Sequence, residues 1–388
     1  MASPDVSPLT VSLIMVCGVF LARWSVPALI RGTSSVGSDV RQAPHLIIWA
    51  VLAGCMWSVA NTMTIYAIRT VGLSIAFPLW NTNSLLGIFW GFILFNELHY
   101  AGWKRWAGVL GGALAMFAGA TLLAIASTNQ VASAQASRGV IAALTAGILW
   151  GTMYIPYRKA YLSGMNPLSF VTFFTIGEFV TMAALAVTYR GPVSLWRELL
   201  SARAVVFWLM LGGFVWVIGD LFQQYAAKYV GISRGIPLSN TNQLWGLLWG
   251  IFVFHELHGG GHRVYAEVIG GSILMSLGAL GIALSSAGEQ EHASWQDAAV
   301  RESERYGIEA DYVRTGMQGV EFDGKTSRRT LLDWVLIAGT SSIFIALAVI
   351  AKVPSMDISL AWTAGIATAM LALLVSCGLA LWRTTRFR

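Results

Sequence analysis

Long apolar stretches, separated by short polar ones, follow one another along most of the chain. Eleven of them are long enough to cross the hydrocarbon core of a bilayer, which takes about 20 helical residues. Inside that core the backbone must be helical, because hydrocarbon offers no partner to a free N–H or C=O group. The stretches are 9–30, 44–68, 74–97, 105–127, 139–159, 166–189, 204–227, 234–255, 264–286, 331–352 and 358–382. The pattern predicts an all-α polytopic membrane protein with about 11 transmembrane helices.

Polar positions within these stretches recur along the chain. The segment Asn81–Asn83 returns 159 residues later as Asn240–Asn242, and the Glu-Leu-His run at 97–99 returns as 256–258. Two membrane-embedded halves that carry uncharged polar groups inside apolar segments are typical of secondary transporters. The repetition therefore predicts a duplicated transporter core.

The repeat divides the chain into four parts. Residues 1–127 form the first repeat, and 128–286 form the second, which begins with a polar linker at 128–138. Residues 287–330 are polar and charge-rich, which indicates a solvated, partly helical connector. Residues 331–388 hold two further hydrophobic helices that match nothing in the repeats.

The start of the two repeats aligns differently from the rest. Gly18–Pro27 resembles Gly147–Pro156 at an offset of 129. Under this alignment the first repeat has four helices, lacks a counterpart of 166–189, and pairs Arg23 with Thr152. The second repeat has five helices.

The positions of basic residues predict an orientation. Cytoplasmic loops carry the excess of Lys and Arg, and an external N-terminus places the connector and most basic loops in the cytoplasm. In this arrangement 44–127 and 204–286 run antiparallel, as an inverted repeat. The first helix would then run parallel to 139–159.

Composition agrees with a membrane protein and excludes several other classes. Hydrophobic residues make up 56% of the 388 residues and charged residues 11%, against about 25% charged in soluble proteins. The net charge of +6 comes from residues at helix ends, so it does not indicate nucleic-acid binding. Cys17, Cys55 and Cys377 lie inside apolar stretches at irregular spacing, which fits neither a disulfide framework nor a metal site. We find no nucleophile–base pair or phosphate loop, and we expect neither an enzyme nor a bound cofactor. No cleavable signal peptide is expected either.

One candidate binding face is present in both halves. Trp57 and Asn61 are four residues apart, as are Trp216 and Asp220, so each pair shares a helix face. An indole beside an amide or carboxylate suits a sugar, because the ring stacks while the polar group accepts hydrogen bonds from hydroxyls. The alternative is an interhelical hydrogen bond with Trp as a packing residue.

A second group of amides follows a proline in each half. In a regular helix, Asn81 and Asn83 cannot both face one cavity. Either one of the two packs against a neighbouring helix, or the backbone opens locally beside Pro78. The amides are candidates for solute contact or for joining the halves. The members of this group are Asn81, Asn83, Asn240, Asn242 and Gln243.

Two carboxylic acids lie within apolar stretches and are candidates for proton coupling. Intramembrane carboxyls are costly and usually functional, so Asp220 is the first candidate and Glu178 the second. The alternative for each is a permanently protonated, hydrogen-bonded carboxyl. Arg23 interrupts the first stretch, and we expect it to reach the membrane interface, with pairing to a carboxylate as the alternative. Glu97 and Glu256 close their helices and are expected to be structural.

These residues resemble a known family. The Gly-Trp-Pro pattern of 147–156, the two Trp faces, the Val-Gly pairs at 71–72 and 230–231, and Glu97 and Glu256 resemble the drug/metabolite transporter superfamily. Within it they are similar to the glucose/ribose porter group of bacterial sugar-uptake proteins. The resemblance covers about residues 9–286 and implies a ten-helix fold with a central cavity that moves small metabolites by alternating access. This chain differs by the helix missing from its first half and by its C-terminal helix pair.

The sequence as a whole predicts a secondary transporter of a small polar solute in the cytoplasmic (inner) membrane, with a sugar as the leading candidate. One form of this hypothesis couples transport to protons by symport. Export of another metabolite or a drug-like amine is an alternative. A membrane scaffold or sensor built on a transporter core is another.

Overall fold

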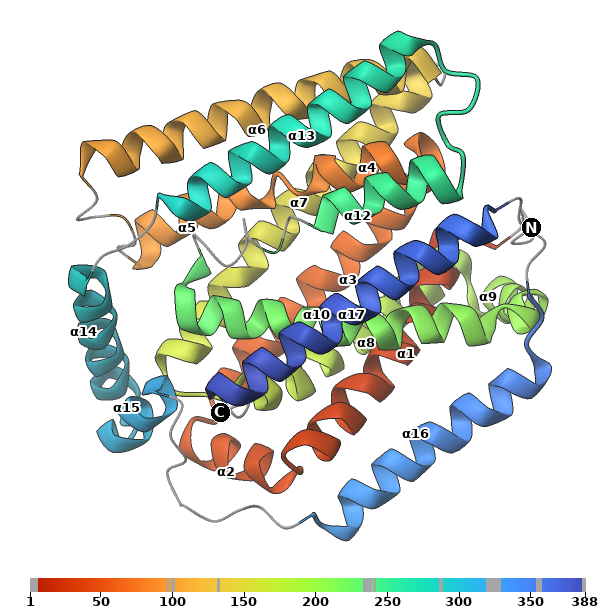
Figure 1. Cartoon of the computed structure of the whole chain (residues 1–388). Helices are drawn as coiled ribbons and strands as arrows, with labels where there is room; N and C mark the ends of the chain where they lie inside the picture. Colours follow the sequence, from red (N-terminus) through yellow and green to blue (C-terminus); the bar gives the residue numbers. More distant parts are fainter. Residues whose placement is uncertain are drawn as a thin grey trace.

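The computed structural model of the protein describes residues 6–95, 98, 102–130, 133–232, 239, 242–285, 289–318, 329–353 and 358–385 (Figure 1). All regular secondary structure in these ranges is helical. The helices up to residue 190 are α1 (Pro8–Ile30), α2 (Ser34–Gln42), α3 (Leu46–Val71), α4 (Leu73–Trp80), α5 (Asn83–Phe95), α6 (Trp103–Gln130), α7 (Ser133–Leu162) and α8 (Pro167–Arg190). The later ones are α9 (Pro192–Ser201), η1 (Ala202–Ala204), α10 (Val206–Val230), α12 (Asn242–Leu248), η2 (Trp249–Val253), α13 (His262–Leu284), α14 (Glu289–Tyr306), α15 (Ala310–Gln318), α16 (Leu331–Ile350) and α17 (Leu360–Thr385).

Within the described residues, nine helices are long and apolar enough to cross a membrane. They are α1, α3, α6, α7, α8, α10, α13, α16 and α17. The chain is therefore an all-α, multi-pass integral membrane protein, as the apolar stretches predict. The predicted helix 74–97 is interrupted, and the predicted helix 234–255 lies partly outside the described residues. The first divides into α4 and α5, and the second contains α12, which continues as the π-helical turn η2.

The interruption of 74–97 falls at the amide segment. Pro78 lies inside α4, which ends at Trp80, and α5 begins at Asn83. Between them the N–H of Asn81 donates to the carbonyl of Pro78 at 3.1 Å, which is the shorter spacing of a turn. Of the two alternatives considered for these amides, the backbone opens locally.

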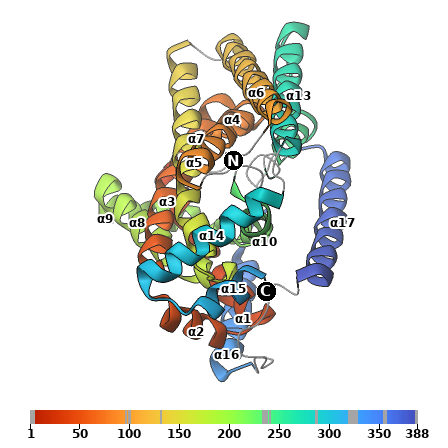
Figure 2. The same cartoon turned by 90° about the vertical axis from the view of Figure 1, so that its left-hand side faces the viewer.

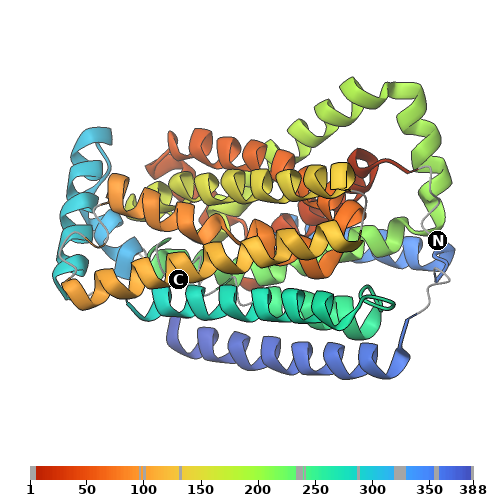
Figure 3. The same cartoon turned by 90° about the horizontal axis from the view of Figure 1, so that it is seen from above.

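Helices α6 and α13 pack side by side and antiparallel, and their contacts are reciprocal (Figure 3). A Cβ atom added at Gly112 would lie 2.5 Å from the carbonyl oxygen of Gly278. One added at Gly119 would lie 2.5 Å from that of Gly271. Gly271 and Gly278 are the residues 159 positions after Gly112 and Gly119. Gly112 therefore contacts the repeat counterpart of Gly119, and Gly119 contacts the repeat counterpart of Gly112.

The crossings of α1 with α10 and of α3 with α8 show the same reciprocity. A Cβ atom at Gly18 would collide with the carbonyl oxygen of Met210, and one at Gly177 with that of Val51. Gly177 lies 159 residues after Gly18, and Met210 lies 159 after Val51. The contact of α1 with α10 is therefore equivalent to the contact of α8 with α3.

This reciprocity corrects the alignment expected at the start of the repeats. The counterpart of α1 is α8, at the offset of 159 that holds for the rest of the repeat, and not α7 at 129. Arg23 consequently corresponds to Met182 instead of Thr152, and Glu178 corresponds to Val19. The helix without a counterpart in the first half is α7. The predicted parallel pairing of α1 with its counterpart disappears, because α1 and α8 run in opposite directions (Figure 1).

The two ends of the helical bundle carry different segments. Helices α14 and α15 of the connector cross one end (Figure 2), where Lys159 at the end of α7 lies 3.4 Å from Glu302. Helix α9 lies at the opposite end, near the start of α1 (Figure 1). The segments predicted to be cytoplasmic therefore share one end, and the choice of which end faces the cytoplasm stays a prediction.

Glu198 of α9 binds the start of α1. Its carboxylate accepts hydrogen bonds from the backbone N–H of Ser7 at 3.0 Å, from the hydroxyl of Thr10, and from Nε of Arg190 at 2.7 Å. Partial burial raises the pKa of Glu198, but these hydrogen bonds outweigh burial and hold the pKa at about 2.

Candidate functional site

A buried ion cluster joins three helices in the centre of the protein. Arg23 of α1 donates from Nη2 to Oδ2 of Asp220 on α10 at 2.8 Å. Its Nη1 lies 3.3 Å from Oε2 of Glu178 on α8. All three side chains are 0% exposed. The expectation that Arg23 reaches the membrane interface is wrong, and the alternative of pairing with carboxylates holds.

The guanidinium of Arg23 also has aromatic neighbours. Its Cζ atom lies 4.1 Å from the ring centroid of Phe174 and 5.4 Å from that of Trp216. Buried charges must be paired to offset the free-energy cost of their desolvation, and the faces of aromatic rings attract the cation further. One cation faces two carboxyl groups here, so the cluster carries one excess negative charge when both are ionised.

A chain of hydrogen bonds leads from the cluster toward the connector. Gln224, one turn after Asp220 on α10, donates from Nε2 to Oδ1 of Asp220 at 3.0 Å. The hydroxyl of Tyr161 on α7 hydrogen-bonds to Oε1 of Gln224. Neither Gln224 nor Tyr161 was among the residues predicted from the sequence. The spacing of four from Asp220 is the signal that could have identified Gln224.

The two predicted tryptophans meet beside this cluster. The ring centroids of Trp57 and Trp216 are 5.0 Å apart, with the rings inclined at 55°. These residues are repeat counterparts, so the two halves contact each other here through equivalent positions. Trp57 is fully buried and Trp216 is half-buried.

Two buried donors on the Trp57 face have no acceptor within the described residues. They are Nε1 of Trp57 and Nδ2 of Asn61. An unpaired buried donor costs about 1–3 kcal/mol. A hydroxyl-bearing solute placed there would supply the missing acceptors.

The predicted amides form a separate group. Nδ2 of Asn81 donates to Oδ1 of Asn242 at 3.1 Å, which joins the two halves, and Asn83 is buried nearby on α5. Asn242 is the counterpart of Asn83 and is an exposed residue. Asn240 and the side chain of Gln243 lie outside the described residues. Trp57 and Trp216 belong to one hydrophobic cluster, and Trp80, next to Asn81, belongs to another, with Trp150 packed against both.

Glu256 has the structural role expected of it. Its carboxylate accepts hydrogen bonds from the N–H groups of Leu73 and Ser74, at 2.8 and 2.9 Å, at the first turn of α4. A carboxylate there satisfies free donors and is attracted by the helix dipole. Glu97 lies outside the described residues.

The comparisons with known proteins find relatives that are named for sugar uptake. Residues 141–306 match the protein family described as "Sugar transport protein". The chain is 32% identical over 120 residues to "Putative sugar uptake protein YxfA" of Lactococcus lactis, which covers 31% of this chain and 37% of that protein. It is 24% identical over 233 residues to "Putative sugar uptake protein lin0215" of Listeria innocua, covering 59% of this chain and 76% of that protein.

A third relative, "Putative sugar uptake protein lmo0176" of Listeria monocytogenes, is 29% identical over 153 residues, covering 39% of this chain and 48% of that protein. The chain thus spans between 37% and 76% of the length of these three relatives. The family match at 141–306 includes the Gly-Trp-Pro pattern of 147–156, Trp216, the Val-Gly pair at 230–231 and Glu256 among the residues that carry the resemblance. The predicted resemblance of this chain to the bacterial sugar-uptake group is confirmed.

Proposed function

We propose that the protein is a secondary transporter that moves a sugar across the cytoplasmic membrane by alternating access. The observation that carries the proposal is the buried cluster of Arg23, Glu178 and Asp220 beside the Trp57–Trp216 contact. Intramembrane charges that face the bundle interior mark solute or ion pathways. The named family and relatives supply the solute class.

The reciprocal contacts support an inverted-repeat mechanism. In a two-fold arrangement, residue i contacts the counterpart of j, and j contacts the counterpart of i. The α6–α13 pair and the crossings of α1 with α10 and α3 with α8 follow this rule. Inverted repeats hold their solute near the midplane, where related helices meet. The Trp57–Trp216 contact is such a meeting point.

Each residue of the site has a distinct proposed role. The half-buried indole of Trp216 stacks on the apolar face of the sugar ring. Asn61 and Trp57 donate to hydroxyl oxygens, while Asp220 accepts from a hydroxyl proton. Arg23 holds Asp220 in position through the 2.8 Å hydrogen bond. The Asn81–Asn242 pair joins the halves, and its contact with solute requires the separate test below.

We further propose symport, with a proton carried by this cluster. The sequence ranks Asp220 before Glu178, and the geometry favours the reverse order. Asp220 accepts hydrogen bonds from Arg23 and Gln224, which stabilise its ionised form. Glu178 makes the longer contact with Arg23, at 3.3 Å. A proton on Glu178 would leave Arg23 and Asp220 as a neutral pair.

Counterflow in proteoliposomes tests the transport proposal. Vesicles loaded with an unlabelled hexose or pentose should accumulate the labelled sugar transiently. Trp216→Ala should weaken the apparent affinity about tenfold, corresponding to about 1.4 kcal/mol lost from ring stacking. Trp196→Ala, on the exposed surface of α9, is the matched control and should behave as wild type. Asn81→Ala should leave the affinity unchanged if the Asn81–Asn242 pair only joins the halves. Exchange of amines and not of sugars would replace the proposed solute class, and no exchange by folded protein would favour a scaffold.

An imposed pH gradient tests symport. Wild type should concentrate the sugar, whereas Glu178→Gln should still exchange it at equilibrium but no longer concentrate it. If Glu178→Gln concentrates sugar normally and Asp220→Asn does not, the proton resides on Asp220. A wild type that never concentrates sugar under this gradient is not a proton symporter.

A further inference from the structure

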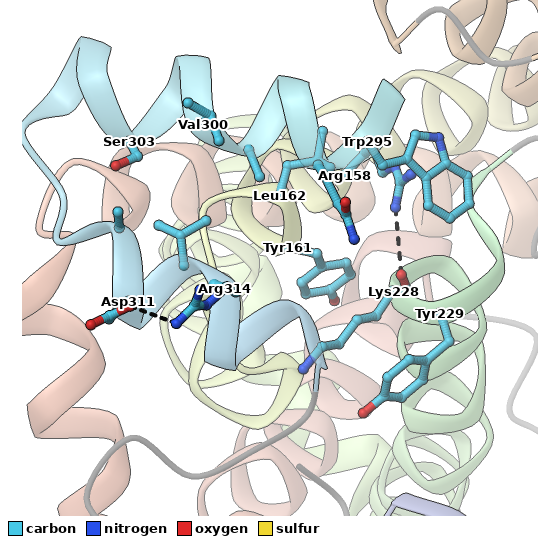
Figure 4. Close-up of a pocket in the computed structure, with 14 residues that line it drawn as sticks. Arg158, Tyr161, Leu162, Lys228, Tyr229, Trp295, Val300, Ser303, Asp311 and Arg314 are labelled. Carbon is cyan, nitrogen blue, oxygen red and sulfur yellow. Dashed lines mark hydrogen bonds and ion pairs between the residues drawn. The ribbon is translucent and has the colours of Figure 1, made fainter. Parts of the chain in front are cut away.

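A cavity of about 540 Å³ lies at the connector end of the bundle (Figure 4). Helices α7 and α10 of the core form one side of it, and α14 and α15 of the connector form the other. The cavity is distinct from the ion cluster. Tyr161 lines the cavity, and its hydroxyl hydrogen-bonds to Gln224, which in turn contacts Asp220 of the cluster. A volume of this size suits a small metabolite.

The charged groups of the wall are mostly cationic. They are Arg158, Lys228 and Arg314, with Asp311 as the one carboxylate. Asp311 pairs with Arg314 at 3.0 Å on the same side of the cavity. Among the residues that line this cavity, three positive charges therefore face one negative charge, which favours an anionic occupant.

Two of these cations are withdrawn from bulk water. Arg158 is 1% exposed and Lys228 is 7% exposed. Trp295 of α14 covers the guanidinium of Arg158, whose Cζ lies 4.0 Å from the indole centroid. Nη1 of Arg158 lies 3.5 Å from the carbonyl oxygens of Ala227 and Lys228. The guanidinium is thus fixed in position, and electrostatic attraction at such a dry site is stronger than at the surface.

The geometry points to a phosphomonoester as the ligand: we propose that this cavity binds a small phosphorylated metabolite through Arg158, Lys228 and Arg314. A planar guanidinium and a lysine ammonium are the usual partners of phosphate oxygens. Inorganic phosphate alone would leave most of the cavity empty, whereas an organic part would contact the rings of Trp295 and Tyr229. Such a ligand would bridge core and connector, because Lys228 belongs to α10 and Arg314 to α15. The proposal does not depend on which solute the chain carries.

Titration calorimetry of the full chain in detergent tests the proposal with three probes. A hexose 6-phosphate should bind more tightly than inorganic phosphate, and the unphosphorylated hexose should not compete for this site. Binding should weaken as salt is raised, because the attraction is ionic. Lys228→Gln should weaken binding about tenfold or more, and Arg314→Gln at an exposed position by about threefold.

The control is Arg263→Gln on α13, which removes an exposed arginine outside the cavity wall. It should bind the hexose phosphate as wild type does. Arg314→Gln keeps the test decisive if Lys228→Gln does not fold. No binding of the hexose phosphate, binding no tighter than inorganic phosphate, or equal losses in Arg314→Gln and Arg263→Gln would each overturn the proposal.

Discussion

Replacing Arg23 by glutamine should be among the most destabilising single changes in this protein. The substitution removes the only cation that contacts both Glu178 and Asp220 among the described residues, where all three side chains are 0% exposed. Removing one member of a buried ion pair costs about 3–5 kcal/mol, because the partner keeps an uncompensated charge. Two carboxyls lose their cation here, so we expect a loss of about 5 kcal/mol in the free energy of unfolding.

Changes at the two carboxyls should cost less, and by different amounts. Asp220→Asn loses a charge-assisted hydrogen bond of 2.8 Å, worth about 1.5–3 kcal/mol, while Arg23 keeps Glu178 as its counterion. Glu178→Gln removes the more distant partner at 3.3 Å and leaves a neutral Arg23–Asp220 pair. Its cost should be the smallest of the three, because Arg23 keeps Asp220 as its counterion and no buried charge is left unpaired. The expected order of cost is Arg23→Gln, then Asp220→Asn, then Glu178→Gln.

Unfolding by sodium dodecyl sulfate in mixed micelles, followed by far-UV circular dichroism, would measure these differences. Arg263→Gln is the control, since its side chain is 79% exposed and surface changes stay within about 0.5 kcal/mol. The double variant of Arg23→Gln with Asp220→Asn should cost at least about 1 kcal/mol less than the sum of the single changes, because the residues are in contact. Equal costs for the three single variants, or additivity in the double variant, would refute the electrostatic reasoning.

Three further predictions address packing, pH and topology. Gly112→Ala should destabilise the α6–α13 contact by about 1–3 kcal/mol, whereas Gly111→Ala, with open space at its Cβ, should be neutral or slightly stabilising. Thermal unfolding of the two variants measures the difference, and equal effects would contradict the packing account. The folded-state pKa of Glu198 at about 2 lies below its ordinary 4.5, so its stabilisation is present above pH 4.5 and is lost as pH falls toward 2. Glu198→Gln should remove that component from a plot of stability against pH, and an unchanged plot would show that the carboxylate contributes nothing there. With the native cysteines replaced, Arg197→Cys should react with an impermeant thiol reagent outside intact cells and Glu304→Cys should not, while the opposite result would invert the predicted orientation.

The sequence was sufficient to predict the helical membrane fold, because apolar length is a local property. It left open whether the backbone opens between α4 and α5, since Pro78 and Asn81–Asn83 lie inside a longer apolar stretch and only the turn in the backbone reveals the interruption. The correct counterpart of α1 was present in the sequence. Pro8, Gly18 and Phe20 recur as proline, glycine and phenylalanine 159 residues later. The Gly-Pro resemblance at an offset of 129 was a weaker signal that led to the wrong helix.

The ion cluster required information that no local pattern contains. An arginine in the last third of an apolar stretch usually reaches the membrane interface, and that prior led to the wrong placement of Arg23. Its partners are on α8 and α10, and only tertiary packing brings them within 3.3 Å. The contact of Trp57 with Trp216 could be anticipated, because a two-fold relation brings equivalent positions together at its axis.

The charged residues of the cluster are not repeated in the two halves, although the helix contacts around them are. Under the offset of 159, the counterparts of Arg23, Glu178 and Asp220 are Met182, Val19 and Asn61, all uncharged. The helix contacts are therefore duplicated while the charges are not. Arg23 belongs to the first repeat and both carboxyls to the second, so a relative movement of the halves must either carry the ion pairs along or break them. A ligand that changes the charge of the cluster can shift a conformational equilibrium only by its difference in affinity for the two states. Because these ion pairs cross between the halves, a proton on Glu178 or a hydroxyl on Asp220 would act directly on the contacts that hold the halves together.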